Sequence, residues 1–307
     1  MPTVARALHG YVNVLKPPAI SSHDVVAFVR RISGQERVGH TGTLDPAAVG
    51  VLPIALGRAT PTVGDPLWDR KLYWADVQFG ARTTTDDGEG DVVESGSPDQ
   101  LTLPDLRSAL DEMAGGISQA PPAVSAIHVG GERAYAQVRR GAAVTLGARH
   151  VWIDRIDVVG WDTPRLSLLV ACRSGTYIRS IARDLGIAVG CPAHLGALVR
   201  LRVGPFDVRE ALDLDELQAV AAGNQWDSVL MPVDLLSPGA PVLVVDEPRA
   251  SDYLAGRNWP AASDSKVTAP AHVLSPHGDW LGFGELTEAG RWQPRRAPVT
   301  SRHENYA

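Results

Sequence analysis

The spacing of hydrophobic and polar residues predicts alternating strands and helices from residue 10 to residue 235. In residues 71–80 hydrophobic positions alternate with more polar ones, as in a half-buried strand whose inward face begins at Tyr73. From Val25 to Ile32 they recur every three or four positions, as in an amphipathic helix. The pattern predicts strands at 10–16, 71–80 and 151–172, the last broken at Asp162-Thr163-Pro164, and helices that begin after Ser21, after Thr102 (ending at Gly115-Gly116) and after Tyr177.

The pattern changes near Pro238. Beyond this residue, short segments that contain Pro, Gly and Trp, such as residues 280–286, predict short strands and tight turns. We therefore expect two domains. Residues 1–237 would form an α+β domain with a mixed sheet, and residues 238–307 a small β module.

The composition, with 44% hydrophobic and 21% charged residues among 307, is that of an ordinary globular protein. Two cysteines, Cys172 and Cys191, give neither a disulfide framework nor metal-ligand spacing, which favours a reducing compartment. The first residues lack a positively charged start followed by an apolar stretch, and no apolar run has membrane-spanning length. We expect a cytoplasmic protein that does not bind membranes.

Charge is unevenly distributed along this acidic chain, whose net charge is -6. Residues 131–209 hold twelve basic and six acidic residues, whereas residues 61–112 hold four and twelve, and residues 210–265 hold two and ten. A net-acidic protein argues against nucleic-acid binding, but a confined basic face would permit it. The candidate phosphate contacts on such a face are Arg133, Arg139, Arg140, Arg200 and Arg202.

One carboxylate stands in a short polar block that leads into an apolar segment. The polar residues run from His40 to Asp45, and residues 47–56 are almost wholly apolar. Pro46 holds Asp45 extended, and nearby glycines allow backbone conformations closed to other residues. An isolated Asp-Pro would be a turn or cap residue. Here, however, the whole block predicts a rigidly aimed carboxylate.

The run G-H-T-G-T-L-D-P-x-A-x-G-V-L-P-I-x-L-G-x-A-T over residues 39–60 resembles the catalytic motif of the TruB family of tRNA pseudouridine synthases. The resemblance implies a pseudouridine synthase fold, with a mixed, mainly antiparallel sheet flanked by helices and a C-terminal PUA-like domain that binds RNA. It also implies that Asp45 is the catalytic carboxylate and that His40 fills the space vacated by a flipped base.

A second stretch, S-G-T-Y-I-R-S at residues 174–180, also resembles this family. Arg179 lies beside an apolar helical stripe, where an arginine is either exposed or the partner of a buried carboxylate. The resemblance implies the second arrangement, with Arg179 paired to Asp45 and favouring its ionised form. It further implies that Tyr73 stacks on the flipped base, while Tyr177 and Leu198 line its pocket.

The polar loop at residues 82–90 contains Asp86 and Asp87 but no His or Cys. We interpret it as a solvated turn without a catalytic part, rather than a metal site. The chain also departs from the family pattern, with Ala19 for Gly, Thr84 for Asp, Val124 for an aromatic residue, His128 for Lys and Val199 for Arg.

The resemblance implies isomerisation of uridine 55 in the tRNA T loop, in which the N1–C1′ bond breaks and C5 is joined to C1′. No metal or cofactor is expected, and tRNA would be the partner of a monomer that needs no other protein. Whether Asp45 attacks C1′ or assists a glycal intermediate stays open. Three alternatives are a guide-RNA-dependent synthase, a non-catalytic tRNA-folding protein, and a structural protein that reuses the fold.

Overall fold

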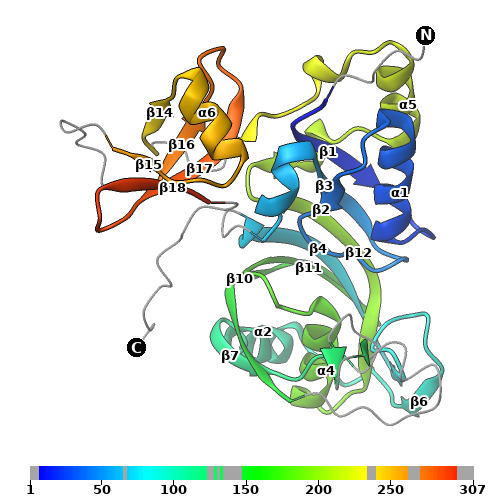
Figure 1. Cartoon of the computed structure of the whole chain (residues 1–307). Coiled ribbons are helices and arrows are strands. Elements are labelled where there is room, and N and C mark those ends of the chain that lie inside the picture. Colours follow the sequence, from blue (N-terminus) through cyan, green and yellow to red (C-terminus); the bar gives the residue numbers. More distant parts are fainter. Residues whose placement is uncertain are drawn as a thin grey trace.

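The computed structural model describes residues 7–64, 68–122, 128–129, 132–133, 147–233, 240–261 and 270–295. They form a large sheet with helices at its two ends and a smaller, separate sheet near the C-terminus (Figure 1). The strands of the large sheet are β1 (Gly10–Lys16), β2 (Val38–His40), β3 (Val49–Leu56), β4 (Lys71–Phe79), β7 (Gly115–Gln119), β10 (Arg149–Asp162), β11 (Arg165–Cys172), β12 (Ala193–Val203) and β13 (Phe206–Asp207).

The large sheet has the order β1-β3-β12-β4-β11-β10-β7, with β2 paired to β3 and β13 to β12. Within the described part of the chain, β12 and β3 run parallel, and all other neighbouring strands of the large sheet are antiparallel. The predicted mixed, mainly antiparallel sheet is therefore confirmed. At its centre β3, β12 and β4 lie side by side.

Helices cover the sheet in two groups. The helices α1 (Ser22–Ser33) and α5 (Leu214–Ala222) pack on β1 and β3, while α2 (Leu103–Asp111) and α4 (Ile178–Ala188) pack on β4, β10, β11 and β12. The predicted capping box of α1 is present, because Ser21 and Asp24 bond each other's backbone N–H groups. The shorter helical turns are η1 (Gly57–Thr62), η3 (Val208–Glu210) and η4 (Trp226–Ser228).

The strands predicted at 10–16, 71–80 and 151–172 are confirmed, as are the starts of the three predicted helices. The predicted end of the second helix is wrong. Helix α2 ends at Asp111, and Gly115-Gly116 begin β7 instead. Gly115 has φ +89°, so it turns the chain into the strand rather than capping the helix.

The C-terminal β module is also present as a sheet of five strands among the described residues, in the order β14-β16-β17-β18-β15. Arg58 of the large domain donates a hydrogen bond of 2.8 Å to the backbone oxygen of Trp280 in this module. The boundary between residues 237 and 238 stays a prediction, because residues 234–239 lie outside the described part. The module consists of β14 (Val242–Val244), α6 (Glu247–Leu254), β15 (Trp259–Pro260), β16 (Ala271–Leu274), β17 (Trp280–Leu286) and β18 (Arg291–Arg295).

Two short hairpins complete the described chain: β5 (Ala81–Thr83) with β6 (Val92–Ser95), and β8 (His128–Val129) with β9 (Glu132–Arg133). None of the described helices is long and apolar enough to span a membrane.

Candidate active site

The polar block predicted from the sequence forms a loop whose backbone is held from several sides. Ser22 Oγ accepts a hydrogen bond from Leu44 N at 2.8 Å and donates one to Leu44 O at 3.0 Å. Lys16 Nζ donates to Pro46 O at 3.0 Å, and its pKa is lowered to about 8 because the side chain is buried. The loop is therefore fixed before any substrate arrives, as a rigidly aimed carboxylate requires.

Asp45 pairs with Arg179 through both of its oxygens, at 3.0 Å from Nε and 3.2 Å from Nη2. This fork-like geometry makes strong, directional hydrogen bonds. The Arg179 side chain is 6% exposed and that of Asp45 is 38% exposed. The pairing implied by the sequence is thus present, and the carboxylate remains accessible.

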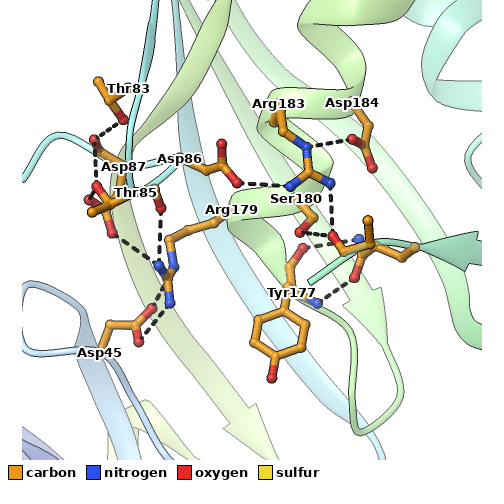
Figure 2. Close-up of polar contacts among 12 residues, drawn as sticks. Asp45, Thr83, Thr85, Asp86, Asp87, Tyr177, Arg179, Ser180, Arg183 and Asp184 are labelled. Carbon is orange, nitrogen blue, oxygen red and sulfur yellow. Dashed lines mark hydrogen bonds and ion pairs between the residues drawn. The ribbon is translucent and has the colours of Figure 1, made fainter. Parts of the chain in front are cut away.

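The loop at residues 84–90 holds the other side of Arg179, as Figure 2 shows. Arg179 Nη1 donates to the backbone oxygen of Thr85 at 3.1 Å and lies 3.6 Å from Asp87 Oδ2. Asp86 is buried and pairs with Arg183 at 2.8 Å. The interpretation of this loop as a solvated turn is wrong, because two arginines one turn apart on α4 draw it inward.

A signal for this contact was present in the sequence. Asp86 and Asp87 are adjacent, and Arg179 and Arg183 are four residues apart on one face of a helix, so each arginine has a carboxylate to meet. Periodicity along a single segment does not reveal such a match between two distant segments.

The residues of both stretches meet around one open cavity of 340 Å³. Asp45, Tyr73, Tyr177, Arg179 and Leu198 all line it, together with Lys71. Burial raises the pKa of Tyr73 to about 12, so its phenol stays neutral at physiological pH. The cavity therefore combines an aromatic face, an apolar wall and an accessible carboxylate.

His40 does not line this cavity. It lies at the start of the polar loop, where its Nδ1 accepts a hydrogen bond from Gly42 N at 3.2 Å. Burial, followed by the charges of Arg200 and His23, lowers the His40 pKa. The ring is therefore neutral at physiological pH and acts on the loop backbone in this structure.

Gln119 is a residue of the site that the sequence analysis missed. Its side chain, 2% exposed, accepts a hydrogen bond from Tyr177 N at 2.8 Å and donates one to Tyr177 O at 3.1 Å. These two bonds fix the backbone at the start of α4, from which Tyr177 and Arg179 project (Figure 2). A lone glutamine at the end of a strand gives no sequence signal for this function.

Arg200 does not belong to the predicted basic face. This side chain is 1% exposed and bonds backbone oxygens, so the prediction that it contacts tRNA phosphates from the surface is wrong. Arg202 is half-exposed and pairs with Asp207 at 2.8 Å. The side chains of Arg133, Arg139 and Arg140 lie outside the described residues, as do those of Val124 and His128.

Within the described ranges, no three His, Cys, Asp or Glu side chains come close enough to hold a metal ion. The expectation of a reaction without metal or cofactor stays a prediction.

The fold that carries this cavity is that of the pseudouridine synthases, as a comparison with solved structures shows. The chain is similar to a solved structure titled "Crystal Structure of a Cbf5-Nop10-Gar1 Complex", with a TM-score of 0.64 and 25% identity over 91% of this chain and 78% of that one. The family model described as TruB family pseudouridylate synthase (N terminal domain) matches residues 30–178. The model described as tRNA pseudouridylate synthase B C-terminal domain matches residues 179–236.

Curated relatives extend the similarity over almost the whole chain. A tRNA pseudouridine synthase B of Xanthomonas axonopodis pv. citri is 39% identical, over 95% of this chain and 95% of its own. One of Gloeobacter violaceus is 43% identical, over 94% of this chain and 98% of its own. The chain belongs to the TruB family of pseudouridylate synthases.

Proposed function

We propose that this protein converts uridine 55 in the T loop of tRNA to pseudouridine, with Asp45 as the catalytic carboxylate. The observation that carries the proposal is the accessible Asp45, held by Arg179 at the edge of a cavity that also presents Tyr73. The names of the relatives, which specify tRNA, support the substrate class.

The surroundings of the two carboxylates at Arg179 favour Asp45 as the reacting group. Asp87 Oδ1 accepts hydrogen bonds from Thr85 Oγ1 and Glu89 N, and its side chain is 15% exposed. Asp45 bonds Arg179 along one side and is open to the cavity on the other. A nucleophile or base must reach the substrate, and Asp45 is the more exposed of the two carboxylates.

The reaction moves one bond and one proton. The N1–C1′ bond breaks, C5 bonds C1′, C5 loses its proton, and N1 gains one. A uridine inside an RNA fold must first be flipped out, and a flipped base needs a flat partner. Tyr73 supplies this stack, and Tyr177 and Leu198 form the walls of the cavity. His40 acts at the loop edge, where it fills the space that the base leaves.

The partner in this proposal is tRNA alone, bound by a cytoplasmic monomer. The C-terminal module, as a PUA-like domain, would bind the tRNA outside the T loop. The alternative is a guide-RNA-dependent synthase that works within an assembly, and the similar solved structure is, by its title, a complex of Cbf5 with Nop10 and Gar1. The relatives named tRNA pseudouridine synthase B are more similar in sequence and are covered more completely, at 95% and 98% of their length against 78%. We therefore favour activity without a guide.

The experiment is to incubate the purified protein with an unmodified tRNA transcript and to map pseudouridine by mass spectrometry. The proposal predicts one pseudouridine, at position 55, and none in a transcript that has cytidine there. Modification only in the presence of a guide RNA would favour the alternative above. Faster tRNA refolding without any pseudouridine would indicate a non-catalytic folding protein.

A further inference from the structure

Arg200 is the buried cation at the centre of the large sheet. It lies on β12, where the strand register pairs it with Gly50 of β3 on one side and with Tyr73 of β4 on the other. Its side chain is 1% exposed although its edge lines the cavity. Gly50 permits this arrangement, because a Cβ there would lie 2.2 Å from the backbone oxygen of Arg200.

The guanidinium connects two parts of the site. Nη2 donates to Gly42 O at 3.0 Å and Nη1 to Thr43 O at 3.2 Å, so Arg200 holds the loop immediately before Asp45. Nε donates to Val51 O at 2.8 Å in β3. Tyr73 of β4 is the cross-strand neighbour of Arg200, whose charge opposes the increase in the Tyr73 pKa caused by burial.

Among the described residues no carboxylate lies within ion-pair distance of Arg200. An arginine that is almost fully buried on backbone carbonyls, without a counter-ion, is costly to desolvate. Packing alone does not account for it, since an apolar side chain would fill this volume at lower cost. Its five donors in a fixed fork suit a group that must hold several acceptors at set positions.

We propose that Arg200 is a positioning residue for the isomerisation: it fixes the Asp45 loop and the Tyr73 ring relative to each other across the cavity. The inference rests on the proposed function. Asp45 acts on the ribose while Tyr73 holds the base, so their separation must be constant while the base turns between its two attachments. An error of about 1 Å in such a placement can cost about a hundredfold in rate.

The test compares Arg200→Met and Arg200→Lys with wild type in single-turnover pseudouridine formation, tRNA binding at several salt concentrations, and thermal unfolding. Arg107→Met, at an exposed position on α2, is the control. We expect Arg200→Met to react about a hundredfold more slowly. Its tRNA affinity and salt dependence should stay unchanged. Arg200→Lys should recover part of the rate, because one ammonium can hold some of these carbonyls but not all.

A double-variant comparison separates positioning from a general effect on the fold. Tyr73→Phe removes only the hydroxyl of the ring that neighbours Arg200 across the strands, so its effect on rate should be smaller in Arg200→Met than in wild type. If the double variant loses rate by the product of the two single losses, Arg200 does not act through Tyr73.

Three further results would overturn the inference. Wild-type rates in a folded Arg200→Met protein would show that the loop needs no clamp. A loss of tRNA affinity, with a salt slope lower by about 0.7 to 0.9, would make Arg200 a phosphate contact. If neither variant folds, the residue serves the fold and not the site. If wild type itself forms no pseudouridine, the proposed function fails first.

Discussion

Two loops bring a carboxylate to Arg179, and they are held in place differently. The loop at residues 42–46 is held by side chains from other elements, since Arg200, Ser22 and Lys16 donate to its backbone oxygens. The loop at residues 84–90 is also bonded from outside, by Arg183 and the backbone of Leu195, but here the loop's own groups bond the carboxylate that faces Arg179, since Asp87 accepts hydrogen bonds from Thr85 and Glu89.

The difference shows how one fold gives the same side chain two functions. Asp45 needs no hydrogen bond from its own loop, because the backbone beneath it is already fixed, and 38% of its side chain stays exposed. Asp87 uses one oxygen, Oδ1, for hydrogen bonds within its own loop, and its side chain is 15% exposed. We infer that preorganisation of the loop backbone by distant residues leaves the Asp45 carboxylate free to react.

Among the residues that hold the two carboxylates, the largest expected effect comes from removing Arg179, the cation that both loops share. Arg179→Met should slow pseudouridine formation by about a hundredfold to a thousandfold, the range for loss of one preorganised charged donor. Arg179→Lys should also be impaired, because a point charge does not replace a planar fork. Single-turnover assays measure both rates.

The matched control is Arg183→Met, one turn further along α4. Arg183 pairs with Asp86 and Asp184, and it does not line the cavity. This variant should lose stability, by about 3 kcal/mol, because it leaves a buried carboxylate unpaired. Its rate loss should be about tenfold smaller than that of Arg179→Met. Equal losses of rate in the two variants would show that the contact of Arg179 with Asp45 contributes no more to the reaction than the contact of Arg183 with Asp86.

A smaller effect should follow from disturbing only the loop at residues 84–90. A Cβ at Gly90 would lie 2.4 Å from Thr85 Oγ1 and 2.7 Å from Thr85 N, whereas one at Gly88 would meet nothing within 4 Å. Gly90→Ala should therefore displace Thr85 and Asp87 and slow the reaction about tenfold, within the range for small misplacements. Gly88→Ala should react like wild type. If the two variants behave alike, the loop does not position Arg179.

The smallest effect is a pH dependence of the free energy of unfolding, and it comes from Lys16, which holds the loop at residues 42–46. Burial lowers the pKa of Lys16 from 10.5 to about 8. Between these values the unfolded chain keeps a proton that the folded chain has released, so the free energy of unfolding rises with pH, by up to about 1.4 kcal/mol per pH unit. Urea unfolding from pH 7 to 10.5 should show a shallower rise in Lys16→Met. An identical rise in both proteins would mean that Lys16 titrates normally.

Sequence patterns predicted the local structure well because local forces determine it. The alternation in residues 71–80 and the capping box at Ser21 depend on neighbours within a few positions, and both are confirmed. The motif around Asp45 pointed to its partner Arg179 through family resemblance, which carries long-range information that periodicity lacks. The structure then supplied the geometry of the pair.

Features that depend on contacts between distant segments were missed or misplaced. Arg200 was expected on a basic surface because charge counts do not show which way a strand residue faces. Ala19, which stands where the family usually has glycine, keeps φ +68° and still donates from its N–H to Pro46 O. An alanine in this left-handed conformation costs about 1–2 kcal/mol, and only the structure shows that the position retains it.

The most direct test of the account compares Asp45→Asn with Asp87→Asn in single-turnover assays on the same tRNA. Both changes keep the shape of the side chain and remove its charge. We predict that Asp45→Asn forms no pseudouridine while it binds tRNA like wild type, and that Asp87→Asn reacts slowly but measurably. Two results would contradict the assignment of Asp45 as the catalytic carboxylate. One is turnover by Asp45→Asn near the wild-type rate. The other is measurable activity in Asp45→Asn when Asp87→Asn has none.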